Sequence, residues 1–387
     1  MKNFTYYAPT EIFFGWGCLS QIGDIAARYG KKALVVTGHS SPSGGGLYEQ
    51  VNKFLTNAGV ESCRFDGVIP NPTTDVVTMG AEVAKAFGAH MVIGLGGGSS
   101  MDAAKAIAVE ASHPGTAWDY LHYTSGPTEK TLPIIAVGTT AGTGSQTTPC
   151  AVITNTAKKD KSAIWHRNIF PRAAIVDPEL TVTMPKDVTA QTGFDAFCHN
   201  FESYISAGTN PLVETIALEG IRIIAENLPK VLADGGDAGA RSKMAWADTL
   251  GGMAIASGGV SLPHGLGMQI GGFCPHVSHG QSLAVFYPEF TRFTWPKAVK
   301  KFAALGRILD AALLHENDEK AAEASCNAID GFLKKIGLWT DFKSLNVSTE
   351  EIRIIADHGQ VLGDYKNNPR IASIEEMYGM LIRCYER

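Results

Sequence analysis

The chain has 387 residues, which is too long for one small core and predicts two domains. Its formal net charge of −5 argues against a nucleic-acid partner and against a basic membrane-binding surface. Seven cysteines without a C-x-x-C pair indicate reduced thiols rather than a disulfide framework. Because neither an export signal nor a run of about 18 apolar residues is recognisable, we expect a cytoplasmic protein that does not span a membrane.

The first half of the chain alternates strand-like and helix-like segments. Short runs rich in β-branched residues predict buried strands at residues 32–37, 91–95, 133–137 and 173–176. Helical character between them is clearest in residues 48–58 and 74–87. Strands separated by helices favour a parallel sheet with helices on both faces.

The strand-like runs stop near Lys186. Apolar residues at helical spacing occupy positions 216–228, and residues 299–314 and 321–336 continue in the same style. We therefore expect an α/β domain over residues 1–185, followed by an all-helical domain over residues 186–387.

A glycine-rich run, Gly94–Ser99, joins the predicted strand at 91–95 to a helix. Glycine lets the backbone approach a phosphate closely, and a helix N-terminus offers unpaired N–H groups and a positive dipole end. The run is not a G-x-G-x-x-G fingerprint counted from Gly94, because the third position is Ser99. The alternative is a tight strand-to-helix turn capped by serine.

A second run, Gly138–Ser145, follows the predicted strand at 133–137 and contains three threonines. Its hydroxyls and backbone N–H groups could hold a ribose or a diphosphate. Ligands of parallel α/β sheets bind at the carboxyl ends of the strands, where both runs would lie. Together the two runs predict a dinucleotide site.

The loop after the first predicted strand bears on the choice of dinucleotide. An aspartate there would bond the adenosine ribose 2′-hydroxyl and repel a 2′-phosphate. This chain has Thr37–Ser41 instead, with no acidic residue. We therefore expect NADP(H) in preference to NAD(H), with Ser40 and His39 as phosphate partners, although an ordinary surface loop is the alternative.

A carboxylate and three imidazoles suggest a metal site. Asp195 and His199 are four residues apart, so on a helix they share one face. His264 and His279 follow across a stretch broken by glycine and proline, with His276 as a competitor for the fourth position. Such a ligand set suits Fe(II) or Zn(II) far better than Mg(II) or Ca(II). Without other context, a surface Asp–His pair is the alternative.

These motifs together resemble the iron-containing (group III) alcohol dehydrogenases. The similarity covers nearly the whole chain, from Tyr7–Thr10 and Phe14-Gly15, through both glycine-rich runs and Gly193–His199, to Asn368–Arg370. The resemblance implies an N-terminal dinucleotide-binding domain, a C-terminal metal-binding domain, cofactor and metal in the cleft between them, and a homodimer or larger assembly.

The resemblance also implies the site residues. The metal ligands are Asp195, His199, His264 and His279, with His279 preferred over His276 because His279-Gly280 leads into an apolar stretch as in the family. The cofactor contacts, with Asp102 added from the first glycine-rich run, are expected to be Gly38, His39, Ser40, Asn71, Gly97, Gly98, Ser99, Asp102, Thr139, Thr140, Thr148, Lys161 and Leu180.

The implied reaction is reversible oxidation of a small alcohol or diol, or reduction of an aldehyde, with hydride exchange to NAD(P)(H). The metal acts as a Lewis acid on the substrate oxygen. Fe(II) is the family's metal, and the ligands also accept zinc. Many relatives have a second histidine where this chain has Met268, so we expect the substrate proton to leave through ordered water.

Two other functions stay open at this point. The architecture also resembles dehydroquinate synthase, a lyase that uses NAD transiently, but its phosphate-bearing substrate needs a basic pocket. No cluster of lysines or arginines surrounds the metal-bearing motifs. A catalytically silent nucleotide binder is the third hypothesis, and it has no need for the four metal ligands.

Overall fold

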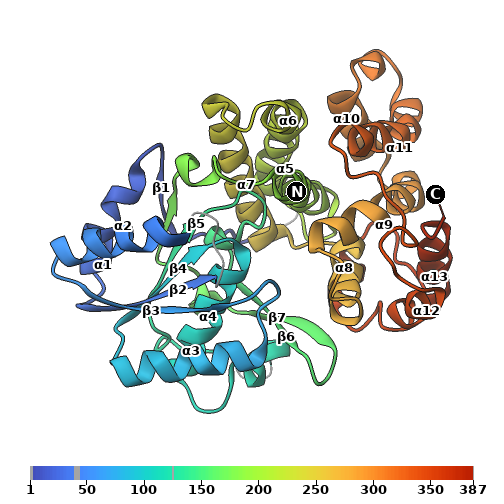
Figure 1. Cartoon of the computed structure of the whole chain (residues 1–387). Helices are drawn as coiled ribbons and strands as arrows, with labels where there is room; N and C mark the ends of the chain where they lie inside the picture. Colours follow the sequence, from blue (N-terminus) through green and yellow to red (C-terminus); the bar gives the residue numbers. More distant parts are fainter. Residues whose placement is uncertain (1–2, 39–43, 124–125, 387) are drawn as a thin grey trace. The chain divides into compact units, whose positions relative to one another are not determined.

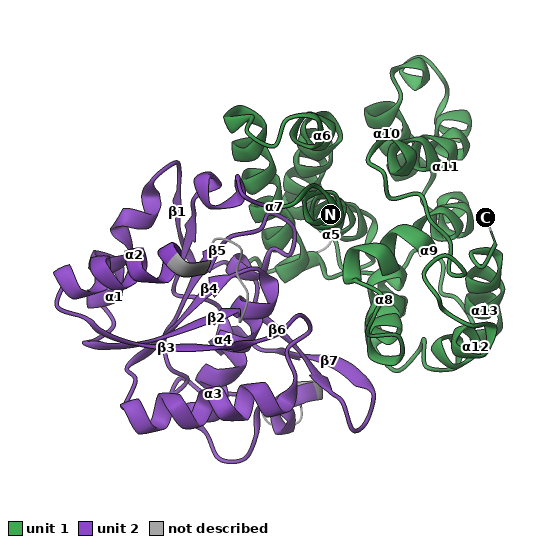
Figure 2. Cartoon of the chain, in the orientation of Figure 1, with its two compact units in different colours: residues 1–6, 185–387 green, residues 7–184 purple. Residues whose placement is uncertain are grey.

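The computed structural model describes residues 3–38, 44–123 and 126–386 (Figure 1). The chain divides into two compact units, one of residues 7–184 and one of residues 185–387 together with residues 1–6 (Figure 2). The first contains a parallel sheet with helices, and the second is helical, so the predicted fold class is confirmed.

The sheet of the first unit has six parallel strands in the order β1-β8-β5-β4-β2-β3. The strands are β1 Glu11–Phe14, β2 Lys32–Gly38, β3 Glu61–Val68, β4 Met91–Gly96, β5 Ile134–Gly138 and β8 Ala173–Val176. The four strands predicted from the sequence are the central ones, and the two edge strands were missed. β1 and β3 are each only partly buried, so they lack the continuous apolar run of a central strand.

Successive residues of β2 point to opposite faces of the sheet, and each face has its own core. Leu34 and Val36 belong to the core that includes Val77 and Ile107, from α3 Thr74–Phe87 and α4 Gly98–Ser112. Ala33 and Val35 belong to the core on the other face, which is covered by α1 Ile22–Ala27 and α2 Gly44–Asn57. The helices on both faces explain why the central strands are apolar throughout.

A separate antiparallel hairpin, β6 Cys150–Asn155 and β7 Asp160–Trp165, lies between β5 and β8 in the sequence. The sequence patterns did not predict it. Ala151, Ile153 and Ile164 are buried in the same core as α3 and α4, so the hairpin belongs to the α/β unit.

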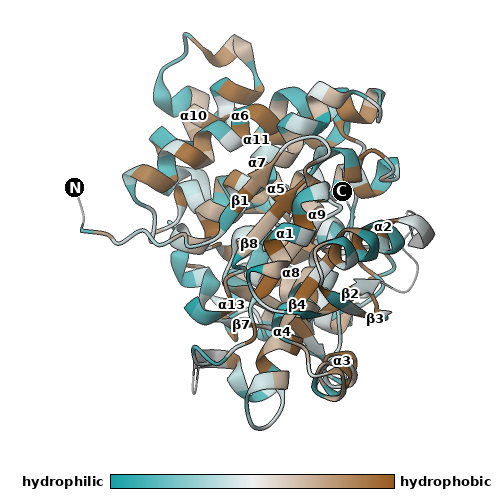
Figure 3. Ribbon diagram, turned by 90° about the vertical axis from the view of Figure 1, so that its left-hand side faces the viewer, coloured by the Kyte–Doolittle hydropathy of each residue, from teal (hydrophilic) through white to brown (hydrophobic). Residues whose placement is uncertain are grey.

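Residues 185–386 form helices and, in this described stretch, no strand. The α-helices are α5 Lys186–Ile205, α6 Pro211–Ala233, α7 Ala238–Gly258, α8 Leu262–Phe273, α9 His279–Thr294, α10 Val299–Leu309, α11 Asp318–Lys335, α12 Thr349–Asp357 and α13 Ile374–Arg383. In Figure 3 many of the helices carry teal and brown residues side by side, the pattern of helices that bury one face. No helix in the described part of the chain is long and apolar enough to cross a membrane.

The expected helix over 299–314 ends earlier, at Leu309. Asp310 has an extended backbone, and its side chain accepts a hydrogen bond from the N–H of Ala312. A short 3-10 turn over Ala311–Leu313 therefore begins there, because an aspartate at this position satisfies the N–H groups of a new turn better than it continues a helix.

Candidate metal centre and cofactor site

Helix α5 carries the first two metal-ligand candidates, Asp195 and His199, and both are buried. Its other face is aromatic: Phe194 and Phe197 stack on each other, and both rings contact Tyr287 of α9 edge-on. This packing fixes the rotation of α5, so the carboxylate and the imidazole face the same place one helical turn apart.

The remaining two candidates come from the starts of two other helices. His264 lies in the first turn of α8, directly after Pro263, and is buried. His279 is the first residue of α9, whose N-terminus is fixed by a capping box of Ser278 and Gln281. The first turns of α8 and α9 thus each place a histidine next to α5.

The three imidazoles converge on one oxygen of the Asp195 carboxylate. Asp195 Oδ1 lies 3.6 Å from Nε2 of His199, 3.4 Å from Nε2 of His264 and 3.6 Å from Nε2 of His279. Ligand atoms of Asp195, His199 and His264 all lie within 4.8 Å of one another. Tetrahedral ligands at about 2.0–2.2 Å from an ion are separated by about 3.3–3.6 Å, so the observed spacing fits one bound metal ion.

Two atoms of this cluster, Asp195 Oδ1 and His264 Nε2, are buried without a hydrogen bond to any other described residue. A buried polar atom left in this state costs free energy. A bound cation would satisfy both atoms at once, because each offers a lone pair toward the centre. The residues present therefore fit a divalent metal.

The electrostatics of the cluster also favour a bound cation. Burial alone would raise the pKa of the Asp195 carboxyl, but the neighbouring imidazoles, His199 first, hold that pKa well below its usual range. Burial alone would lower the pKa of His264, yet the carboxylates of Glu202 and Asp195 raise it to about 10. The site therefore favours a bound positive charge, either a proton or a metal cation.

Glu202 is a functional residue that the sequence analysis missed. It is completely buried, and its Oε1 lies 2.7 Å from Nδ1 of His264. Its Oε2 accepts hydrogen bonds from the N–H and the hydroxyl of Ser261 at 2.8 and 3.2 Å. Since a carboxylate only accepts, Nδ1 carries the proton and Nε2 is left to face the centre. Glu202 follows His199 by three residues on the same face of α5, and this spacing could have indicated that it belongs to the site.

The structure distinguishes between His276 and His279 as candidates for the fourth ligand. His276 is exposed, and its Nε2 lies 3.1 Å from the carbonyl oxygen of Leu345. His279, in contrast, is within 3.6 Å of Asp195. Met268 lies one turn after His264 on α8 and is partly buried.

The first glycine-rich run joins β4 to α4, as expected. A Cβ on Gly94 would lie 2.8 Å from the backbone of Met101, and Gly96 has a φ of 149°, so both positions require glycine. The N-cap position of α4 is Gly97, which has no side chain, so the serine-capped turn does not form. The first-turn N–H groups, at Gly98 and Ser99, are therefore suited to an anion.

The second glycine-rich run lies against the first. The N–H of Thr139 donates to the carbonyl of Gly96 at 2.9 Å, and a Cβ on Gly98 would collide with Thr143. The hydroxyl of Thr140, next to Gly97, is buried and has no hydrogen-bond partner in the described part of the chain. A buried donor beside an uncapped helix N-terminus fits a phosphate ligand.

Asp102 and Lys105 form a buried network behind these two runs. Asp102 accepts hydrogen bonds from the Ser145 hydroxyl at 2.6 Å and from the N–H of Val152 at 3.1 Å. Lys105, fully buried, lies 3.6 Å from Asp102 and donates to the carbonyls of Ser145 and Cys150 at 2.7 and 2.6 Å. Asp102 is thus engaged within the protein, and Lys105 was not singled out from the sequence.

The other expected cofactor residues are dispersed over this unit. The Lys161 amine donates to Asn71 Oδ1 at 2.8 Å, and Asn71 holds a φ of 55°. Lys105 also donates to the Thr148 hydroxyl at 3.3 Å. Leu180, in a 3-10 turn over Pro178–Thr181, packs against the core beneath α1 and α2. Gly38 ends β2, whereas His39 and Ser40 lie outside the described residues.

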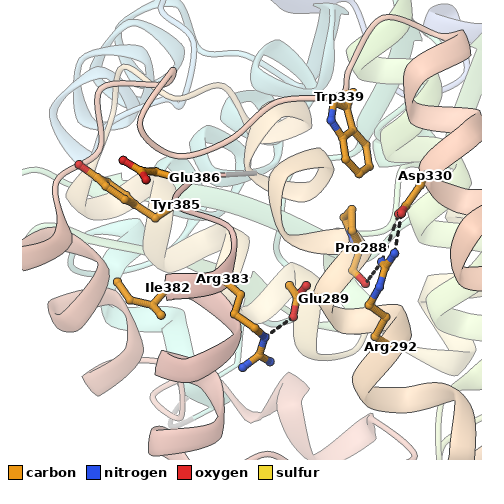
Figure 4. Close-up of a pocket in the computed structure, with 9 residues that line it drawn as sticks. All are labelled: Pro288, Glu289, Arg292, Asp330, Trp339, Ile382, Arg383, Tyr385 and Glu386. Carbon is orange, nitrogen blue, oxygen red and sulfur yellow. Dashed lines mark hydrogen bonds and ion pairs between the residues drawn. The ribbon is translucent and has the colours of Figure 1, made fainter.

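A separate pocket of about 700 Å³ lies in the helical unit and shares no residue with the metal cluster (Figure 4). Its two arginines are already paired: Arg292 with Asp330, and Arg383 with Glu289 at 2.6 Å. No group of the pocket is thereby left to attract a charged ligand strongly, and we assign it no role.

Comparisons with known proteins agree with this geometry. The profile of a family described as "Iron-containing alcohol dehydrogenase" matches residues 9–178, and that of its C-terminal region matches residues 189–385. The chain is 34% identical to the NAD-dependent methanol dehydrogenase of Bacillus methanolicus, over 97% of this chain and 98% of that protein. It is 30% identical to the NADPH-dependent butanol dehydrogenase of Clostridium saccharobutylicum, over 97% and 96%. A crystal structure of 1,3-propanediol oxidoreductase superposes with a TM-score of 0.93 at 32% identity, covering 99% of this chain and 100% of that one.

Proposed function

The chain belongs to the iron-containing alcohol dehydrogenase family, and on that premise we propose that it interconverts a small alcohol or diol with its carbonyl compound. It is an oxidoreductase that uses NAD(P)(H) as the hydride carrier. The observation that supports this proposal most is the convergence of three imidazoles on one buried carboxylate oxygen.

In this proposal the metal is Fe(II), with Zn(II) as the alternative, held by Asp195, His199, His264 and His279. When bound, the ion supplies Lewis acidity that stabilises negative charge on the substrate oxygen. Asp195 contributes the only negative charge among the four ligands and so moderates the charge of the centre. Glu202 keeps the proton of His264 on Nδ1, and the aromatic packing around α5 keeps bulk water away from one side.

The nicotinamide supplies or takes the hydride. The chain's part is to bind the dinucleotide through the two glycine-rich runs, with the diphosphate at the N-terminus of α4. We place this role in the domain of residues 1–185 and the metal in the domain of residues 186–387. With Met268 on α8 instead of a histidine, no imidazole follows His264 by one turn, so the alcohol proton leaves through water.

The dehydroquinate synthase hypothesis is not favoured, because the relatives are alcohol dehydrogenases. The silent-binder hypothesis is disfavoured by the metal cluster, which nucleotide binding does not require.

We also propose NADP(H) in preference to NAD(H), since β2 ends in Gly38 rather than an acidic residue. The relatives named above include one NAD-dependent and one NADPH-dependent enzyme. A cytoplasmic location, as expected from the sequence, is part of the same proposal.

A homodimer is the assembly we propose. β1 is an edge strand of the sheet, a position at which a second chain can add to the sheet. Phe14 at its end and the nearby Trp16 are exposed by 41% and 45%, an apolar surface suited to a second copy.

The direct test is the absorbance of the reduced cofactor during incubation of Fe(II)-reconstituted protein with a panel of short alcohols, diols and aldehydes. Turnover in both directions is the expected result. Cofactor binding with no net oxidation or reduction of any compound would refute the proposal.

A further inference from the structure

Arg64, on edge strand β3, is held in a fixed position beside the end of β2. Its Nε donates a hydrogen bond to the Thr37 hydroxyl at 3.2 Å. Its guanidinium carbon lies 5.0 Å from the ring centroid of Tyr48 on α2, a cation–π contact. Arg64 pairs with Val35 in the sheet register, so its side chain reaches along β2 toward the carboxyl end of that strand.

Among the residues that the structure describes, this guanidinium has no acidic partner. No carboxylate of the described residues lies within 4.0 Å of it, whereas several surface arginines, such as Arg28 with Glu11 at 2.9 Å, are paired. Nor do its two terminal nitrogens have an acceptor among the residues that the structure describes. The bond to Thr37 and the cation–π contact with Tyr48 use only Nε and one face of the guanidinium. No residue of the described chain therefore occupies its terminal N–H groups, which can bind a ligand.

The position of Arg64 coincides with one end of the expected dinucleotide. β2 lies between β4 and β3 in the sheet (Figure 1), and β4 leads directly into the glycine-rich start of α4. With the diphosphate at that helix N-terminus, the adenosine ribose belongs at the carboxyl end of the neighbouring strand, β2. Thr37 and Gly38 form that end, and they bring no negative charge.

We propose that Arg64 is the residue that selects NADP(H), by binding the 2′-phosphate of its adenosine ribose. The assignment rests on the proposed function in one respect, the use of a dinucleotide. A planar guanidinium with free terminal N–H groups forms two parallel hydrogen bonds to a phosphate. NAD(H), which has a hydroxyl at this position, gains no comparable charge-assisted contact.

The alternative is a structural role, in which Arg64 only packs α2 onto the sheet. Two substitutions separate the possibilities. Arg64→Gln removes the charge and keeps a polar, though shorter, side chain. Gly38→Asp adds the carboxylate that bonds a ribose 2′-hydroxyl. Among the described residues, the atom nearest to a Cβ at this position is the carbonyl oxygen of Val68, at 3.6 Å, so these residues leave room for the new side chain.

The experiment measures the dissociation constants of NADP⁺ and NAD⁺ by titration calorimetry on the full, EDTA-treated chain, with adenosine 2′,5′-bisphosphate as a competitor. Removing a charge-assisted hydrogen-bond partner weakens binding about 10- to 100-fold. We expect that loss for NADP⁺ and the bisphosphate in R64Q, with NAD⁺ changed less than about twofold. R64K should show a smaller loss, and G38D should reverse the preference. R28Q, which removes an exposed and paired arginine of the same unit, should change neither constant.

Equal weakening of NADP⁺ and NAD⁺ in R64Q would assign Arg64 a structural role and overturn the proposal. Unchanged NADP⁺ binding would also overturn it, while leaving the dinucleotide site intact. If neither nucleotide bound the unmodified chain, the dinucleotide site and this assignment would both fail. Because binding is measured without metal or substrate, these outcomes can be interpreted even if the enzyme is inactive.

Discussion

Nδ1 of His264 lies 2.7 Å from Oε1 of the fully buried Glu202, so one metal-ligand candidate is oriented by a second carboxylate from the helix that carries Asp195 and His199. The same glutamate binds the backbone N–H of Ser261 at the start of α8. Glu202 therefore ties the first turn of α8 to α5 and sets which nitrogen of His264 faces the centre.

Glu202→Gln should weaken metal binding without unfolding the chain. The amide oxygen still accepts from Nδ1, but the negative charge that strengthens His264 as a ligand is lost. Removing such a partner costs about 10- to 100-fold in metal affinity. Competition between the metal-free protein and a chromophoric chelator for Zn²⁺ measures this. E219Q, which changes an exposed glutamate paired with Arg222 on α6, is the control and should leave affinity unchanged. Equal affinity of E202Q and the unmodified chain would contradict the role given to Glu202.

Metal affinity should rise with pH, because a proton competes for His264. Its pKa in the folded, metal-free protein is raised to about 10, above the usual value of 6.5. The protonated form therefore adds stability that is fully present below pH 6.5 and is lost as the pH rises toward 10. As the pH rises, the metal-free protein loses this stabilisation. The metal-loaded protein does not, because the metal ion takes the place of the proton on His264. Over pH 7–9 the difference in Tm between the two forms should widen, and Zn²⁺ affinity should rise up to about tenfold per pH unit. A difference independent of pH would show that no proton is displaced.

Gly94→Ala and Gly331→Ala should change stability in opposite directions. A methyl at Gly94 would lie 2.8 Å from the Met101 backbone, so β4 or α4 must shift, at a cost of about 1–3 kcal/mol. Gly331 is exposed within α11, with nothing within 4 Å of a new Cβ, so alanine should add about 1 kcal/mol of helix stability. Thermal unfolding of the two variants tests this. An unchanged Tm for G94A would mean that the close approach of α4 to β4 is not needed.

Lys105→Met should destabilise the α/β unit strongly, by about 3–5 kcal/mol, because it leaves the Asp102 carboxylate buried without its cation. The double variant D102N/K105M should recover part of this loss, since it removes the uncompensated charge as well. Thermal unfolding of both variants, compared with D102N alone, measures the coupling. A double variant no more stable than K105M would show that the hydrogen bonds of Lys105 to Ser145 and Cys150, rather than the ion pair, dominate.

Phe14→Asp should dissociate the proposed homodimer, because it places a charge on the exposed end of edge strand β1. Met79→Asp is the matched control: Met79 is a more exposed apolar residue, at 57%, on helix α3 of the same unit. Sedimentation velocity should give a dimer for the unmodified chain and for M79D, and a monomer for F14D. Dissociation by M79D rather than F14D would place the interface elsewhere.

The sequence patterns predicted the strands that are continuous apolar runs and the residue pairs that are related by helical spacing. The central strands β4 and β5 are apolar throughout because helices cover both faces of the sheet. Asp195 and His199 are four residues apart, a spacing that places both side chains on one face of a helix. Edge strand β3 was missed because Arg64 and its polar neighbours give no such run.

The missed site residues share one property: each is a charged residue that a sequence pattern assigns to the surface. Glu202 and Lys105 are fully buried, and their partners lie 62 and 40 residues away in the chain. Only the fold brings Glu202 to His264, Lys105 to Ser145 and Arg64 to Thr37. Pairings across such separations depend on how helices and strands pack, which local spacing does not encode.

The central claim is that Asp195 and its three histidines hold one divalent ion on which hydride exchange depends. Metal analysis of anaerobically purified protein, followed by chelation and titration with Fe(II) or Zn(II) while NAD(P)H absorbance is recorded, tests it most directly. The account predicts one equivalent of metal per chain, loss of turnover on chelation, full recovery at one equivalent, and neither binding nor recovery in Asp195→Asn. Undiminished turnover in metal-free protein, or in the Asp195 variant, would contradict it.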